Sequence, residues 1–129
     1  MVGSTFKKPW GKFITYCCNN EATVKIITLN AGEELSLQSH KHRDELWIPL
    51  DDGILIDIDF VRHKSKRYSE YWIQRTMLHR ASNPSKKDKS FIEISFGKFN
   101  ENDIKRYEDK YGRKVSKLPR KFRRIFQTI

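Results

Sequence analysis

The feature that most constrains the fold is a strict alternation of apolar residues in the middle of the chain. Ile54, Ile56, Ile58 and Phe60 occupy every second position, and two aspartates are among the residues between them. Because successive side chains of a strand point to opposite faces of its sheet, this pattern predicts a half-buried strand. The Asp-Asp-Gly sequence at residues 51–53 is typical of a hairpin turn leading into it.

Further short β-prone runs lie on both sides of this strand, separated by turn signals. They cover residues 24–29, 35–42, 46–50, 71–73 and 91–96. Many short strands at close spacing favour an antiparallel sandwich or barrel, so we expect one all-β domain. No apolar run approaches the ~20 residues of a membrane span. The N-terminal residues also lack the apolar segment of a signal peptide.

The pattern changes after the last of these runs and predicts a closing helix. Asn100 is placed as its N-cap, and acidic residues follow in the first turn, where the helix dipole favours anions. Ile104, Tyr107 and Tyr111 form one apolar stripe, and Gly112 occupies the position typical of a helix C-terminus. Residues 1–113 are therefore expected to form the barrel domain with its closing helix.

Residues 114–129 are predicted to form a second, basic helical extension that begins near Ser116. Its apolar side is expected to dock, and it consists of Leu118, Phe122, Ile125 and Phe126. The net charge of the chain is +10, and this segment contributes six basic residues and no acid. We interpret the basic side as a solvated helix face, because no interleaving of aromatic and basic residues marks a nucleic-acid reading surface.

Cysteine usage indicates the compartment. Cys17 and Cys18 are the only cysteines, and adjacent cysteines rarely bridge each other. With no other partner for a disulfide, the sequence favours a reducing, cytoplasmic setting.

The residues with the most informative chemistry lie between positions 35 and 45, with a later histidine. Gln38, His40 and His42 alternate along one predicted strand, so all three can point to one barrel interior. Glu45 opens the next run, and His79 lies in a separate segment. Imidazole nitrogens and a carboxylate suit zinc, manganese, iron, cobalt or nickel.

The spacing of these residues and several longer motifs resemble a known family. Gln38-x-His40, four residues and Glu45, then a later His, is similar to the cupin metal motif with glutamine in place of the first histidine. Read from His42 instead, the spacing to Glu45 is one residue too short. Further motifs occur in the same order: Pro9-Trp-Gly-Lys-Phe13, Leu35-Ser-Leu-Gln-x-His-x-His-Arg-x-Glu45-x-Trp47, His79-Arg-x-x-Asn-Pro84, Ile92-Glu93 and Asp103-Ile-x-Arg106-x-Glu-Asp109-x-Tyr-Gly-Arg113. Together they resemble the cupin domain of type II mannose-6-phosphate isomerases, which is often fused to a mannose-1-phosphate guanylyltransferase.

The resemblance implies a cupin (RmlC-like jelly-roll) double-stranded β-barrel that holds one divalent metal ion, zinc in first place. The implied ligands are Gln38, His40, Glu45 and His79. The implied activity is aldose–ketose isomerisation of a phosphorylated hexose, mannose 6-phosphate to fructose 6-phosphate, in nucleotide-sugar and polysaccharide biosynthesis. Cupin barrels commonly pair, and their exposed edge strands give a physical reason for a homodimer.

Isomerisation also needs a proton carrier and a phosphate-binding group. His42 and Asp44 are the candidates for the general base, and the sequence does not choose between them. Arg43 and Arg80 are candidates for holding the substrate phosphate, because a guanidinium matches an anion of that shape. Strand alternation offers the alternative that each arginine points away and makes surface ion pairs.

One departure from the family pattern favours an alternative function. The family usually has Ile-Pro-x-Gly before the final His-Arg, whereas residues 73–77 here are Ile-Gln-Arg-Thr-Met. Loss of this glycine favours a cupin that binds metal and an anionic sugar or metabolite without isomerising it.

Overall fold

The computed structural model describes residues 3–122 of the chain, and these residues are almost entirely β-structure. This confirms the all-β prediction. The strands are β1 (Ser4–Lys8), β2 (Gly11–Thr15), β3 (Ala22–Leu29), β4 (Leu37–Ser39), β5 (Arg43–Pro49), β6 (Leu55–Ile58), β7 (Val61–Lys64), β8 (Tyr71–Ile73), β9 (His79–Ser82), β10 (Lys89–Gly97) and β11 (Lys105–Glu108). One 3-10 helix, Arg120–Phe122, completes the described elements.

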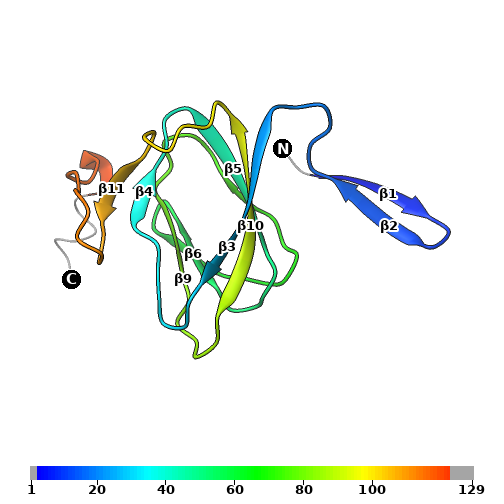
Figure 1. Cartoon of the computed structure of the whole chain (residues 1–129), viewed down its shortest axis with the longest axis horizontal. Helices are drawn as coiled ribbons and strands as arrows, with labels where there is room; N and C mark the ends of the chain where they lie inside the picture. Colours follow the sequence, from blue (N-terminus) through cyan, green and yellow to red (C-terminus); the bar gives the residue numbers. More distant parts are fainter. Residues whose placement is uncertain (1–2, 123–129) are drawn as a thin grey trace.

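Two antiparallel sheets face each other and enclose the core (Figure 1). One sheet has the strand order β3-β10-β5-β8, and the other has the order β11-β4-β9-β6-β7. The remaining strands, β1 and β2, form a separate hairpin that projects to one side of the barrel (Figure 1).

The core lies between the inward faces of the two sheets. It consists of Leu29, Trp47, Ile54, Ile56, Ile73, Ala81 and Phe91, all of which are buried. Strand alternation explains this set, because Trp47 and Ile56 are central members of the period-2 patterns in β5 and β6. The rings of Trp47 and Phe91 lie 4.7 Å apart and fill the middle of the barrel.

The strand predicted to reach Phe60 ends two residues earlier, at Ile58. Asp59 and Phe60 have positive φ angles of 46° and 65°, and β7 starts at Val61. Two left-handed residues between paired strands are typical of a tight hairpin turn. Because the apolar alternation continues through the turn to Phe60, the sequence pattern did not show where the strand ends.

The predicted closing helix after residue 100 is wrong. Lys105–Glu108 is strand β11, which pairs with β4. The carboxylate of Asp103 accepts hydrogen bonds from the backbone N–H groups of Lys41 and His42, at 3.0 and 2.9 Å, and so caps a neighbouring loop instead of a helix. Pairing with β4 outweighs the helical apolar spacing, because β11 covers backbone groups of β4 that would otherwise be an open sheet edge.

The second predicted helix is present only in part. Residues 114–119 are irregular, and the 3-10 helix follows at Arg120. The remainder of the predicted extension, residues 123–129, lies outside the described part of the chain. Among residues 3–122, no helix is long and apolar enough to cross a membrane.

Candidate metal centre

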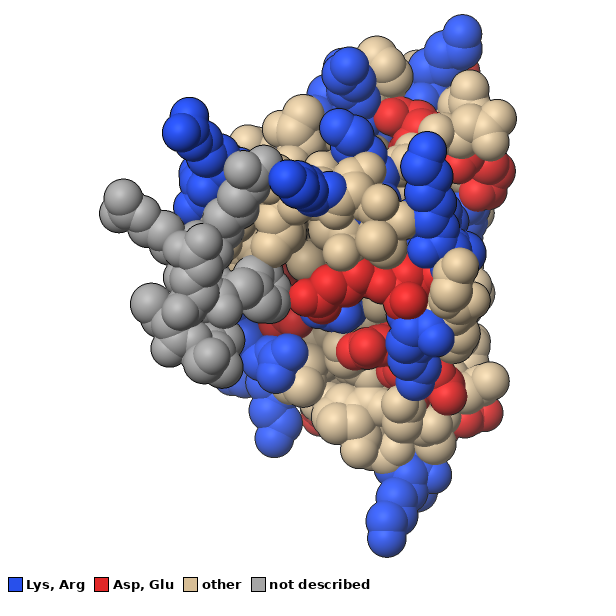
Figure 2. Space-filling model, turned by 90° about the vertical axis from the view of Figure 1, so that its left-hand side faces the viewer, with Lys and Arg blue, Asp and Glu red and all other residues tan. Residues whose placement is uncertain are grey.

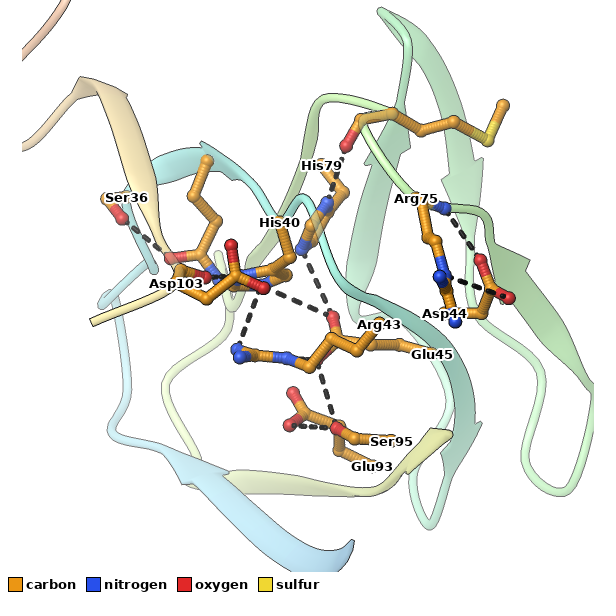
Figure 3. A network of polar contacts seen from close by, with 12 residues as sticks. Ser36, His40, Arg43, Asp44, Glu45, Arg75, His79, Glu93, Ser95 and Asp103 are labelled. Carbon is orange, nitrogen blue, oxygen red and sulfur yellow. Dashed lines mark hydrogen bonds and ion pairs between the residues drawn. The ribbon is translucent and has the colours of Figure 1, made fainter. Parts of the chain in front are cut away.

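Two histidines and one glutamate meet inside the barrel (Figure 3). Their potential ligand atoms all lie within 4.8 Å of one another. Oε1 of Glu45 is 3.2 Å from Nε2 of His79 and 3.5 Å from Nε2 of His40. Each of the three side chains is buried. We refer to His40, Glu45 and His79 as the His/Glu/His cluster.

Strand register brings the cluster together from three separate segments. Glu45 lies in β5 on the same face as Trp47, so its side chain points inward. His79 opens β9, where it lies opposite Gln38 of β4 on one side and Ile58 of β6 on the other. His40 follows directly after β4. These three residues belong to the ligand set that the family resemblance implies, and the structure brings them together.

Backbone carbonyl groups fix the orientation of both imidazoles. Nδ1 of His40 donates to the carbonyl oxygen of Asp103 at 2.8 Å, and Nδ1 of His79 donates to the carbonyl oxygen of Met77 at 2.9 Å. A carbonyl oxygen only accepts, so the neutral rings carry their proton on Nδ1 and present a lone pair on Nε2. Both lone pairs therefore face the Glu45 carboxylate.

The cluster suits a divalent cation. Glu45 Oε1 and His79 Nε2 are buried and have no hydrogen-bond partner among the described residues. Leaving such atoms unsatisfied in a protein interior is costly, and three electron-pair donors directed at one point are what a metal ion requires. Carbonyl groups behind both imidazoles are also typical of metal-ligating histidines. The donor set matches zinc, manganese, iron, cobalt or nickel.

Charge and burial act in opposite directions on the cluster. Burial alone raises the pKa of Glu45, but His79, His40 and Arg43 outweigh it and lower that pKa to about 2. Burial lowers the pKa of His40 to about 4, although the Glu45 carboxylate opposes this shift. At neutral pH the carboxylate is therefore ionised and His40 is neutral, which is the form that a metal ion binds.

Gln38, the fourth predicted ligand, lies beside the cluster on β4. It is the cross-strand neighbour of His79, and its side chain is half-buried. Its Oε1 accepts a hydrogen bond of 2.9 Å from the hydroxyl of Ser36. Its role as a ligand remains a prediction.

Arg43 brings a positive charge to the cluster. The side chain is buried, and it donates to Glu45 Oε2 at 3.4 Å and to His40 Nε2 at 3.3 Å. It also donates to the carbonyl oxygen of Asn100, and its guanidinium lies over the ring of Phe99. Of the two predicted phosphate-binding arginines, Arg43 is the one that faces the cluster (Figure 3).

Arg80 is on the opposite side of its strand from the cluster. His79 points inward, so Arg80 points to the outer face of the sheet, where it pairs with Glu108 at 2.6 Å and Glu34 at 3.7 Å. Acidic side chains gather near the middle of the face that carries β11, with Lys and Arg side chains around them (Figure 2). The prediction that Arg80 holds the substrate phosphate is therefore corrected. The side chain makes surface ion pairs instead, which is the alternative that strand alternation offered.

Neither predicted general base is buried in the cluster. Asp44 alternates with the inward-facing Arg43 and Glu45, so it points outward, and its carboxylate interacts with the backbone N–H and guanidinium of Arg75 (Figure 3). His42 is exposed in the loop before β5. Strand alternation, counted outward from Glu45, could have excluded Asp44 from the sequence alone.

Glu93 is a buried acid beside the cluster that the sequence analysis did not assign a role. Ser95 donates to Oε2 of Glu45 at 3.3 Å and is 3.4 Å from Oε1 of Glu93, so it links the two carboxyl groups. Burial and then the nearby Glu45 charge raise the pKa of Glu93 to about 7. Alternation within residues 91–96 carried the signal, since it places one acid on the same inward face as Phe91.

The raised pKa of Glu93 predicts an unusual pH dependence of stability in the metal-free protein. The folded state keeps this proton up to about pH 7, whereas the unfolded chain loses it near pH 4.5, so stability falls as pH rises between these values. Glu93→Gln removes that loss. Urea unfolding with a chelator present should show the variant more stable than wild type by roughly 3 kcal/mol at pH 8 and by no such margin at pH 4.5. An equal difference at both pH values would contradict this explanation.

The turn before His79 keeps a left-handed residue where the family has glycine. Thr76 has a φ of 69°, and its N–H donates to the carbonyl oxygen of His40 at 2.7 Å. A β-branched residue is strained in this conformation. The turn is therefore linked to one of the cluster residues although its glycine is absent.

Thr76→Gly is expected to stabilise the protein by about 1 kcal/mol, because relief of the strained φ exceeds the extra entropy of glycine in the unfolded chain. Thermal unfolding measures the effect. Thr28→Gly in the regular strand β3 is the matched control and should destabilise the protein. Destabilisation by both variants would show that the Thr76 side chain contributes more than its strain costs.

The barrel and its buried His/Glu/His cluster define a protein of the cupin class. The fold is shared with a cupin protein (BF4112) from Bacteroides fragilis, with a TM-score of 0.54, 21% identity, and coverage of 75% of this chain and 79% of that one. It is also shared with the capsular polysaccharide assembling protein CapF from Staphylococcus aureus, with a TM-score of 0.63, 14% identity, and coverage of 83% of this chain and 34% of that one.

Sequence comparison gives the family within this class. The family model described as mannose-6-phosphate isomerase C-terminal matches residues 2–109, and the chain belongs to this family. The alginate biosynthesis protein AlgA of Pseudomonas aeruginosa is 35% identical over 107 residues, which cover 82% of this chain and 22% of that protein. The xanthan biosynthesis protein XanB of Xanthomonas campestris pv. campestris (strain B100) is 37% identical over 108 residues, covering 82% and 23%. The mannose-1-phosphate guanylyltransferase of Escherichia coli (strain K12) is 33% identical over 107 residues, covering 82% and 22%. The matched region thus spans less than a quarter of each of these relatives.

Proposed function

We propose that this chain is a metal-dependent aldose–ketose isomerase of a phosphorylated hexose, converting mannose 6-phosphate to fructose 6-phosphate for polysaccharide or nucleotide-sugar biosynthesis. The observation that supports this most is the His/Glu/His cluster, whose unsatisfied buried atoms suit one divalent ion in a chain of this family. Zinc is the metal we place first, with manganese, iron, cobalt and nickel as the alternatives. Free Cys17 and Cys18 are consistent with action in the cytoplasm.

The reaction moves a proton between adjacent carbons, and negative charge develops on the sugar oxygens as it does so. A metal ion bound to His40, Glu45 and His79 would act as a Lewis acid toward those oxygens. Arg43 is the cationic side chain beside the cluster, so we assign it the binding and orientation of an anionic part of the substrate. Its position over Phe99 and its bond to Asn100 hold the guanidinium in place.

The proposed proton carrier differs from the residues expected from the sequence. Asp44 points away from the cluster and His42 is exposed, whereas Glu93 is a carboxyl linked to Glu45 through Ser95. Glu93 is buried on the inward face of β10 and is the carboxyl group nearest to the cluster apart from Glu45, which is the position that a proton carrier for a bound substrate requires. We therefore propose Glu93 in place of His42 and Asp44.

The proposal is tested by isomerase turnover on metal-free and metal-loaded protein. Chelation should abolish conversion of mannose 6-phosphate, and one equivalent of zinc or manganese should restore it. Asp44→Asn is the matched control and should retain activity, because Asp44 faces Arg75 outside the barrel. Metal-loaded protein that does not isomerise mannose 6-phosphate would contradict the proposal.

A second candidate function is a cupin that binds metal and an anionic sugar without converting it. The outward position of Asp44 and the exposure of His42 favour this alternative. Calorimetry distinguishes the two functions, because binding of mannose 6-phosphate without turnover would select the second one. The strained turn at Thr76 opposes it, since the backbone conformation before His79 is maintained without glycine.

A further inference from the structure

Several cationic side chains surround one hollow at an end of the barrel. The hollow has a volume of about 640 Å³ and lies between the loop before β6, the end of β7 and the start of β10. Its lining residues are Asp52, Gly53, Lys64, Ser65, Lys66, Arg67 and Lys89. Two loops and one strand thus bring four positive charges together, against the single carboxylate of Asp52. We call Lys64, Lys66, Arg67 and Lys89, with the space between them, the basic hollow.

None of these four cations forms an ion pair with a carboxylate of the described chain. Nζ of Lys89 donates to the backbone carbonyl of Asp52 at 2.6 Å, and Nη2 of Arg67 donates to the hydroxyl of Tyr68 at 2.7 Å. The Asp52 carboxylate accepts a hydrogen bond of 2.7 Å from the backbone N–H of Arg67. Ion pairs do form elsewhere in the chain, at Lys25, Arg62, Arg75, Arg80, Lys110 and Arg113. The positive charge of the basic hollow is therefore left uncompensated by the protein itself.

Two of the lysines converge over Gly53. A Cβ atom at this position would lie 3.1 Å from Nζ of Lys89 and 3.9 Å from Cε of Lys64. Like charges held over one point of the backbone repel each other, and fixing two long side chains there also costs conformational entropy. An anion between them replaces this repulsion by two charge-assisted hydrogen bonds. Gly53 leaves the room that such an anion needs.

The floor of the hollow is held by hydrogen bonds of the buried Ser65. Its hydroxyl donates to the carbonyl oxygen of Asp51 at 2.9 Å and accepts from the N–H of Ile54 at 2.8 Å. Its N–H donates to the carbonyl oxygen of Ile54 at 2.7 Å, and its own carbonyl oxygen accepts from the N–H of Gly53 at 2.9 Å. These bonds join the loop before β6 to the end of β7. The backbone that carries the cations is therefore positioned without a ligand, which lowers the cost of binding one.

The basic hollow is separate from the His/Glu/His cluster. Lys89 is the first residue of β10, whereas Ser95, which contacts Glu45, lies near the other end of that strand. At ~3.3 Å per residue, these two positions are about 20 Å apart. An assignment of the hollow therefore does not depend on the isomerase proposal.

We propose that the basic hollow binds the diphosphate group of a small molecule. One phosphoryl group lies over Gly53 between Lys64 and Lys89, and the next faces Lys66 and Arg67, whose guanidinium matches two oxygens of a phosphate. Cations from separate segments around one hollow suit a compact anion of high charge, whereas an extended acidic polymer requires cations along a stripe. The volume is in the range of small-molecule sites and leaves room for the rest of the ligand.

Calorimetry with inorganic pyrophosphate on the metal-free full chain tests the site, because zinc at the cluster binds the same anion. We expect one pyrophosphate per chain, bound at least about 10-fold more tightly than orthophosphate. Lys64→Gln/Lys89→Gln should weaken binding by about 10-fold or more and leave zinc affinity unchanged. Lys7→Gln/Lys12→Gln in the β1–β2 hairpin removes the same charge and is the matched control, with an affinity within about twofold of wild type.

Gly53→Ala separates geometry from charge. It keeps every cation but places a methyl group where the two lysines meet, so pyrophosphate binding should weaken by about 10-fold while circular dichroism shows an intact barrel. Adenosine diphosphate distinguishes the sources of the group: tighter binding than pyrophosphate identifies a diphosphate ester, and weaker binding identifies free pyrophosphate. No pyrophosphate binding by wild type, equal losses in the two lysine double variants, or unchanged binding by Gly53→Ala would each overturn the proposal.

Discussion

Glu45→Gln should reduce the affinity of this protein for a divalent ion by more than about 100-fold. The substitution keeps the size of the side chain but removes the charge on which both Nε2 atoms of the cluster converge. It also leaves a neutral amide where a metal ion would need an ionised carboxylate. The barrel should persist, because Glu45 contributes no apolar contact to the core.

Competition with a coloured zinc chelator measures this change in affinity. Asp44→Asn is adjacent in sequence and makes the same chemical change on the outer face, so it should bind zinc as the wild type does. If Glu45→Gln and wild type bind zinc equally well, the metal does not depend on this cluster.

Arg43→Met should lower kcat/KM for mannose 6-phosphate by about 1000-fold while zinc remains bound, if the proposed isomerase function is correct. The reason is that Arg43 is the buried cation next to the cluster, and methionine keeps much of its length without any charge or donor. Arg43→Lys should recover little, since a lysine cannot reproduce the contacts with Glu45, His40 and Asn100 together.

The control for Arg43 is another arginine that pairs with an acid outside the barrel. Arg75→Met removes the partner of Asp44 and should change kcat/KM little. Zinc affinity and circular dichroism of Arg43→Met are needed as well, because breaking a buried ion pair can destabilise a protein by about 3–5 kcal/mol. A folded, zinc-loaded Arg43→Met with unchanged kcat/KM would remove Arg43 from the mechanism.

The sequence predicted the strands that are encoded by local alternation and missed the elements that depend on distant partners. Period-2 apolar spacing identified β6, and a short β-prone run identified β10, because both signals are local to the strand. β11 was predicted as a helix, since its apolar spacing is helical and its pairing with β4 involves residues more than sixty positions away. The β1–β2 hairpin was not among the predicted strands, because no strict apolar alternation marks a hairpin that projects from the barrel.

For the candidate site, too, features that depend on pairing between distant strands were missed. The family resemblance implied His40, Glu45 and His79 as members of one ligand set, and the structure brings them together. The assignment of Asp44 did not use the alternation that places its neighbours inside, so Asp44 was given a role at a site that it does not face. For Arg80, alternation offered a surface ion pair as the alternative, and the structure shows that ion pair. Glu93 was quoted as part of a motif, but its proximity to Glu45 depends on the pairing of β10 with β5.

The central claim is that His40, Glu45 and His79 hold one divalent ion. The most direct test is anomalous X-ray diffraction at the zinc edge from a crystal of the zinc-loaded protein. The expected result is a single strong peak per chain between His40 Nε2, His79 Nε2 and the Glu45 carboxylate. A zinc-loaded crystal in which these three side chains are ordered, with the anomalous peak at some other place or absent, would contradict the account.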